Sequence, residues 1–61
     1  MYYIGEIIYE NDKEIVKLWD DTPYHFIRKA EKKIKEIQKQ YNWGQLKVID
    51  DNIYNIIKEE L

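Results

Sequence analysis

The chain contains no cysteine and no serine, and it has one histidine among its 61 residues. It therefore forms no disulfide, and a single histidine is too few for a zinc site of the Cys/His type. The usual Ser–His and Cys–His nucleophile pairs are excluded as well. The two glycines lie in unrelated contexts and do not build a phosphate-cradling loop. We predict a non-enzymatic protein with no catalytic residues, no metal and no other cofactor.

Long apolar runs are also lacking, since no stretch approaches the roughly 20 residues of a membrane-spanning helix. The first ten residues carry two glutamates and no basic residue, which is unlike a signal peptide. We expect a cytoplasmic protein (in the host cytoplasm if the protein is viral) with no membrane partner. The length predicts a single domain, residues 1–61, that buries only about 60% of its unfolded surface. Aromatic packing or self-association must then support the core, so a homodimer is one hypothesis.

Charge is distributed unevenly along the chain, although the net charge is only −2. Residues 1–21 carry two Lys and six Asp/Glu, a net charge of −4. Residues 22–42 carry six Lys/Arg and two Glu, a net charge of +4. Residues 43–61 carry two Lys and four Asp/Glu, a net charge of −2. Such asymmetry affects association and orientation more than the fold.

A β-hairpin is predicted at the start of the chain, with strands at 1–10 and 13–20. Both stretches are rich in Ile, Val, Tyr and Trp, and Asn11-Asp12 between them favours a type I′ turn. This turn places opposite charges across the two strands, which supports the register. The predicted cross-strand partners are Glu10–Lys13, Ile8–Ile15, Glu6–Lys17 and Ile4–Trp19.

A helix is predicted over 22–42, with Thr22 as its N-cap and Pro23 at its first position. Gly44 would end it. The apolar repeat that should face the core is Ile27, Ala30, Ile34, Ile37 and Tyr41. A strand at 45–50 and a helix at 51–60 follow, and the inner side of this last helix should carry Ile53, Ile56, Ile57 and Leu61.

These elements predict a small α+β domain of ββαβα order. The three strands should form an antiparallel sheet in the order 2-1-3, packed on one long helix, with a short C-terminal helix. Two pairs of aspartates, Asp20-Asp21 and Asp50-Asp51, directly precede the predicted helices. We interpret them as helix caps in preference to metal ligands, even though His25 lies near the first pair.

Both faces of the predicted hairpin are apolar. We expect the long helix to cover the face of Tyr3, Gly5, Ile7, Tyr9, Val16 and Leu18. The opposite face carries apolar residues where a solvated face should alternate to polar ones. Either the C-terminal helix covers this second face, or the face is an interface for a protein partner or a second copy. Its candidate interaction residues are Tyr2, Ile4, Ile8, Ile15 and Trp19.

A basic ridge is predicted on the long helix, beside its buried stripe. Its members recur at spacings of four, three and four and are Arg28, Lys32, Lys35 and Lys39. Such a ridge can follow phosphates. Glu31 and Glu36 lie at helix-supporting distances from the lysines, which favours an ordinary solvated face. A solvated face, a docking face for an acidic protein and a nucleic-acid interface all stay open.

The leading functional hypothesis is a small protein-binding module that masks a surface of a larger protein partner. Its most concrete version is a phage or mobile-element inhibitor of a host defence nuclease. Such an anti-defence inhibitor would approach a basic nucleic-acid channel with its acidic residues Glu6, Glu10, Asp12 and Glu14. The alternative is a small nucleic-acid-binding protein that uses the basic ridge. A structural subunit of a larger assembly is a third class.

Overall fold

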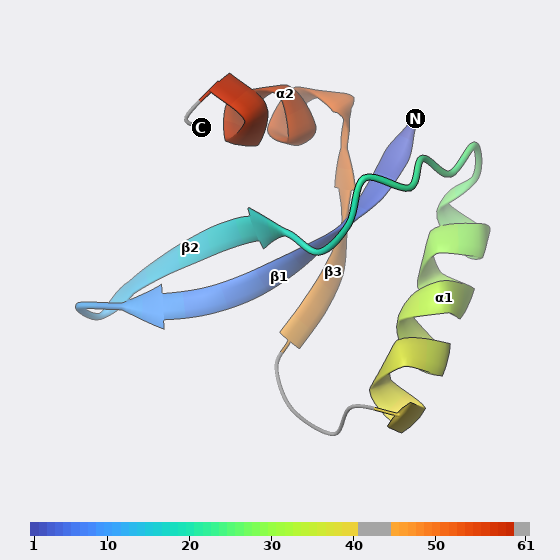
Figure 1. Cartoon of the computed structure of the whole chain (residues 1–61), viewed down its shortest axis with the longest axis horizontal. Helices are drawn as coiled ribbons and strands as arrows, with labels where there is room; N and C mark the ends of the chain where they lie inside the picture. Colours follow the sequence, from blue (N-terminus) through green and yellow to red (C-terminus); the bar gives the residue numbers. More distant parts are fainter. Residues whose placement is uncertain (41–44, 60–61) are drawn as a thin grey trace.

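The computed structural model describes residues 1–40 and 45–59. The three strands form one antiparallel sheet in the order β2-β1-β3, with a helix packed on it and a short second helix after β3 (Figure 1). This confirms the predicted α+β class and strand order. The predicted helix exit at 41–44 and the predicted inner residue Leu61 lie outside the described residues. The elements are β1 (Tyr2–Glu10), β2 (Lys13–Leu18), α1 (Ile27–Gln40), β3 (Gln45–Asp50) and α2 (Asp51–Glu59).

The hairpin of β1 and β2 has the predicted register, from Glu10 opposite Lys13 to Gly5 opposite Leu18. Asn11 and Asp12 have φ angles of 52° and 65°. Two consecutive left-handed residues are what a type I′ turn requires, and its twist matches that of the strands. A two-residue turn of short polar residues therefore sets the register of the first half of the sheet.

The segment between β2 and α1 departs from the prediction. Trp19 still pairs with β1, since its N–H donates to the Ile4 carbonyl at 2.9 Å. The chain then leaves the ladder and returns at Tyr24. The Tyr24 N–H donates to the Tyr2 carbonyl at 2.8 Å, and the Tyr2 N–H donates to the Tyr24 carbonyl at 2.7 Å. A residue paired in this way is extended, so the helix cannot begin before it. The predicted start at Thr22 is therefore wrong.

The helix α1 instead begins at Ile27. The carbonyl of Phe26 accepts the first bonds, from Lys29 N–H at 3.1 Å and Ala30 N–H at 3.4 Å. Phe26 thus occupies the N-cap position, and its side chain offers no hydrogen bond to the free N–H groups. The first turn contains no acidic residue. The helix start is stabilised neither by a side-chain cap nor by its charges.

The helix α1 packs on the opposite face of the sheet from the one predicted. Ile4 forms the centre of the core with Ile34 and Ile37 of α1, and Trp19, Tyr24, Leu46 and Val48 pack against them. Ile4 is fully buried. The expectation that α1 covers the face of Tyr3 and Ile7 is therefore wrong. Ile27 is also not a core residue, because 44% of it is exposed.

The helix α2 covers part of the other face, so the sheet carries a helix on each side (Figure 1). Asp50 caps α2 as predicted, accepting a hydrogen bond from the Ile53 N–H at 3.0 Å. The Tyr54 ring stacks on Tyr3 of β1, with centroids 3.9 Å apart and planes at 8°. Ile56 was predicted to face inward and is 55% exposed, so that prediction is wrong.

The first aspartate pair is not a helix cap. The side chain of Asp20 accepts a bond from the Thr22 N–H at 3.2 Å, which makes a local turn. Asp21 instead reaches α2, where Tyr54 donates its hydroxyl at 3.1 Å and Lys58 its ammonium at 3.1–3.2 Å. The loop after β2 is thereby tied to the helix that covers the Tyr3 face.

This cluster predicts a pH dependence of stability. Hydrogen bonds from Lys58 and Tyr54 lower the pKa of Asp21 below its ordinary value of 3.8. A lowered folded-state pKa contributes stability above the unfolded value, and this contribution is lost as the pH falls through the folded value. The thermal midpoint of wild type should exceed that of Asp21→Asn at neutral pH, and the difference should vanish in acid. A difference that persists in acid would show that the carboxylate charge is not its cause.

Candidate functional site

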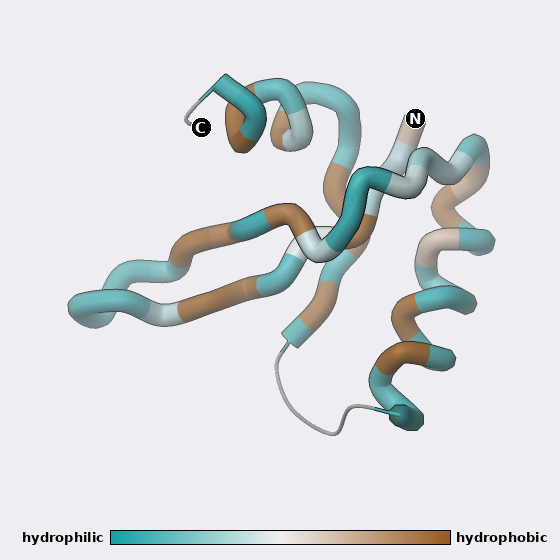
Figure 2. Tube along the Cα trace, viewed as in Figure 1, coloured by the Kyte–Doolittle hydropathy of each residue, from teal (hydrophilic) through white to brown (hydrophobic). Residues whose placement is uncertain are grey.

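The outer part of the hairpin, residues 7–16, forms an arm that extends beyond α1 (Figure 1). We call it the hairpin arm. The helix α1 packs on β1 and β3 but makes no contact with β2 in the described part of the chain. Two apolar cross-strand pairs lie in the arm, Ile8–Ile15 on the α1 side of the sheet and Ile7–Val16 on the α2 side. All four are only partly buried, and they form the brown stretches of the arm in Figure 2.

The outer edge of the arm offers unpaired backbone groups. In a two-residue hairpin the pair that flanks the turn is hydrogen-bonded, and so is every second pair after it. The bond from Trp19 to Ile4 fits this alternation. The N–H and carbonyl groups of Glu14, Val16 and Leu18 therefore point to the outer side of β2, where no other described strand pairs with them. Such an edge can accept a strand from a partner.

The turn end of the arm is acidic and exposed. Of the predicted acidic docking residues, Glu10, Asp12 and Glu14 are exposed, whereas Glu6 is half-buried. Tyr9 beside them is 64% exposed. Within the described residues, none of these carboxylates forms an ion pair within 4 Å. The acidic groups are thus available to a basic partner, next to an exposed aromatic ring.

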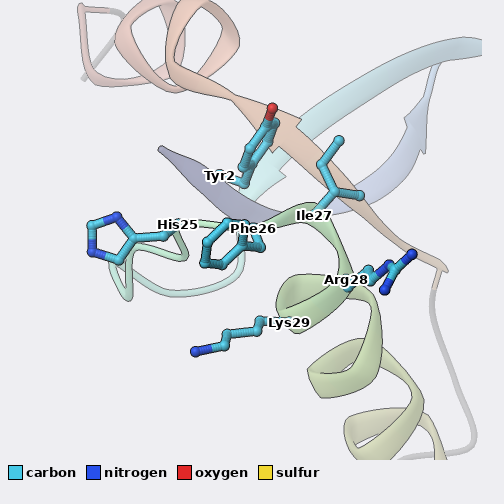
Figure 3. Close-up of a pocket in the computed structure, with 6 residues that line it drawn as sticks. All are labelled: Tyr2, His25, Phe26, Ile27, Arg28 and Lys29. Atoms are coloured by element: carbon cyan, nitrogen blue, oxygen red, sulfur yellow. The ribbon is translucent and has the colours of Figure 1, made fainter.

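The predicted interaction face of Tyr2, Ile4, Ile8, Ile15 and Trp19 is divided by α1. Ile4 is fully buried, so its inclusion in an exposed patch is wrong. Trp19 packs against the same core cluster. Ile8 and Ile15 stay half-buried in the arm. Tyr2 lies at the other end of β1, beside the start of α1 (Figure 3).

The basic ridge is exposed along its length. Its four residues are Arg28, Lys32, Lys35 and Lys39. The ridge lies opposite the buried stripe, about 160° away at about 100° per residue, so its placement beside the stripe is wrong. Among the described residues, the ion pair within α1 joins Lys33 and Glu36 at 3.9 Å, and no ridge residue is paired. The ridge therefore presents four free cations on the solvent side of α1.

A groove that the sequence did not predict lies at the start of α1, and we call it the α1 groove (Figure 3). It encloses about 530 Å³ and is lined by Tyr2, His25, Phe26, Ile27, Arg28 and Lys29. Phe26 is 63% exposed, and the Lys29 ammonium lies 5.8 Å from the centre of its ring. The groove brings together Tyr2 and Arg28, which the sequence had placed on two different surfaces. No sequence signal pointed to this groove, because the sequence predicted a capped helix start at Thr22 and not the start at Ile27.

In the described ranges, no three His, Cys, Asp or Glu side chains gather as ligands for one metal ion. Neither described helix is long and apolar enough to cross a bilayer. Comparison with protein-family models, with curated proteins and with solved structures finds no match to this chain. The surfaces on which this chain can bind a partner are the hairpin arm, the basic ridge and the α1 groove.

Proposed function

We propose that the chain is a small, non-enzymatic protein-binding module that masks a surface of a larger partner through its hairpin arm. The observation that carries this proposal is the arm itself. Its two apolar pairs, Ile8–Ile15 and Ile7–Val16, are only partly buried. On the side of Ile8–Ile15, α1 does not reach β2, and on the other side α2 contacts β2 but leaves Ile7–Val16 partly exposed. Branched apolar side chains beside a free strand edge favour a partner that adds a strand and covers the arm.

The composition of the arm supports a basic site on that partner. The exposed carboxylates of Glu10, Asp12 and Glu14 surround the turn and outnumber the exposed Lys13 opposite Glu10, so the tip is acidic on balance. An acidic tip attached to an apolar stem suits insertion into a positively charged channel, because opposite potentials steer the two surfaces together. The most concrete form of the proposal is an inhibitor, encoded by a phage or mobile element, that occludes the nucleic-acid channel of a host defence nuclease.

Affinity capture from a lysate of the native cell tests this function. The tagged chain is used with and without nuclease treatment, and retained proteins are identified by mass spectrometry. The proposal predicts a protein that is retained after nuclease treatment and that binds the purified chain directly. Recovery of nucleic acid alone, released at moderate salt, would contradict it.

Ile8→Thr with Ile15→Thr tests the arm without removing its β-branched side chains, which suit a strand. We expect binding of the captured partner to weaken at least about tenfold, since two buried interface anchors together contribute more than about 2 kcal/mol and about 1.4 kcal/mol is tenfold. Isothermal calorimetry with wild type and variant measures the change, and circular dichroism checks that the variant is folded. Unchanged affinity in a folded variant would exclude the arm as the contact.

A second candidate is nucleic-acid binding, favoured by the unpaired cations of the basic ridge. Lys32→Glu with Lys35→Glu should abolish such binding and reduce its salt dependence, because each phosphate contact adds to the slope of log K against log salt. Fluorescence anisotropy with labelled single-stranded and duplex DNA at several salt concentrations measures this. The same variant serves as the control for the arm, since it should leave partner binding unchanged.

A further inference from the structure

We propose that the α1 groove is a second docking site, which binds an acidic peptide segment of a partner through one or two adjacent apolar anchor residues. The site is separate from the hairpin arm, so it stands or falls independently of the function proposed above. Its walls are apolar and its rim is basic, and these two properties define the peptide that fits.

The fold leaves the apolar walls of the α1 groove exposed to solvent. Phe26 and Ile27 are 63% and 44% exposed, and they stand at the helix start, where polar residues are usual. Tyr2 faces them from β1 (Figure 3). Its backbone is fixed by the two hydrogen bonds to Tyr24. An aromatic ring and a branched side chain around a space of about 530 Å³ suit one or two adjacent apolar side chains of a ligand.

The charges around this space have one sign. The charged lining residues are Arg28 and Lys29, and no carboxylate lines the groove. The first turn of α1 also lacks an acidic residue, although acids stabilise a helix start and cations destabilise it. The helix start thus lacks the acidic residues that would stabilise it, at the same place where its apolar residues are exposed. Such losses of local stability are expected at functional sites. A ligand that complements the charge of this groove is acidic.

The same observations favour a peptide over a nucleic acid. Three lining residues, Tyr2, His25 and Phe26, carry rings on which a base could stack, but the branched aliphatic side chain of Ile27 lies beside them and offers no ring. The Lys29 ammonium already lies over the Phe26 ring. The pocket walls therefore select an aliphatic or aromatic side chain flanked by carboxylates. Single-stranded DNA is the competing ligand in the test.

The test is a titration of the ¹⁵N-labelled full chain, followed by amide chemical shifts in NMR. The main probe is a synthetic decapeptide of Asp and Glu with a central Leu-Phe pair. Two matched peptides replace either the Leu-Phe pair with Ala-Ala or the acids with Lys, and an oligothymidine is the fourth probe. We expect the main probe to shift the amides of Tyr2 and residues 25–29, and each matched peptide to bind at least about tenfold more weakly.

Two variants separate binding from folding. Phe26→Asn supplies the missing cap, and Lys29→Glu supplies the missing acid, so each should raise the thermal midpoint. Each should also weaken the main probe at least about tenfold. Lys32→Glu places the same charge change on α1 outside the groove and should leave probe binding within about twofold.

In these two variants the thermal midpoint should rise while the affinity for the main probe falls. Residues that bind a ligand should behave in this way, and residues with a merely structural role should not. Equal binding of the lysine peptide, stronger binding of the oligothymidine, shifts confined to other residues, or unchanged affinity in Phe26→Asn would each overturn the proposal. The variant Ile8→Thr with Ile15→Thr should bind the main probe as wild type does. A result that contradicts binding by the hairpin arm can therefore be told apart from a result that contradicts binding by the α1 groove.

Discussion

Ile4→Ala should remove most of the stability of the fold at 25 °C. Ile4 is fully buried in the central strand. It is packed by Ile34 and Ile37 from α1 and by two side chains of β3, Leu46 and Val48. Truncation of such a residue costs about 2–5 kcal/mol, because transfer energy is lost and a cavity remains. A domain of this size without disulfides rarely has more than about 3–5 kcal/mol of stability in total.

Urea unfolding followed by circular dichroism at 222 nm, a standard helix signal, measures this effect. Ile56→Ala is the matched control, since the same truncation is made at a residue that is 55% exposed on α2. Alanine also has the higher helix propensity, so the control should be as stable as wild type within about 0.5 kcal/mol. Ile4→Val should fall between them, with a loss of about 0.5–1.5 kcal/mol. Equal unfolding midpoints for Ile4→Ala and Ile56→Ala would show that Ile4 is not a central residue of the core.

The parts of the fold that the sequence predicted depend on local chemistry. Asn11-Asp12 selects a two-residue turn, and the turn alone determines which residues of β1 and β2 are opposite each other. The bounds of β3 are the ones predicted, and Asp50 caps the helix that follows it. Each of these features is determined within a few residues of its own sequence signal.

The assignment of helices to faces was not accessible from the sequence. The strand β1 carries large apolar residues at even positions, such as Ile4 and Ile8, and at odd positions, such as Tyr3 and Ile7. Side-chain alternation shows which residues share a face, but it does not show which helix covers that face when both are apolar. The stacking of Tyr54 on Tyr3 and the bond from Lys58 to Asp21 join distant parts of the chain. No local pattern contains this information.

The start of α1 shows a long-range interaction overriding a local signal. Thr22 and Pro23 have the composition of a helix start, yet Tyr24 is paired with Tyr2. Two backbone hydrogen bonds to the central strand hold it extended. The helix is thereby moved to Ile27, where Phe26 is a poor cap and the first turn is basic. The α1 groove is a product of this displacement, which explains why the sequence did not predict it.

Gly5→Val should destabilise the fold by about 3 kcal/mol, at the upper end of the range for overpacking a core. Gly5 is buried in the central strand. A Cβ atom there would lie 3.0 Å from the Ile49 Cγ2 and 3.0 Å from the Val16 Cγ1, with the Lys17 carbonyl oxygen at 3.5 Å. Ile49 is almost fully buried and cannot move into solvent. The two methyl groups of valine add further contacts to a space where the first carbon already requires its neighbours to shift.

Gly5→Ala allows the cause to be isolated, because it adds only the Cβ atom. Alone it should cost about 1–3 kcal/mol despite the higher strand propensity of alanine. Val16→Ala removes one of the two atoms that the new Cβ would meet. The double variant should therefore be less destabilised than the sum of the single variants, with a coupling of about 0.5–3 kcal/mol.

Leu46→Ala is the control partner for this cycle. Leu46 lies opposite Glu6 on the α1 side of the sheet, so it shares no contact with a side chain at position 5. Its effect should add to that of Gly5→Ala within about 0.5 kcal/mol. Additivity with Val16→Ala as well would contradict the close approach of Val16 to Gly5. Coupling with Val16 alone would show that Val16 of the hairpin arm approaches Gly5 so closely that an added Cβ atom displaces it.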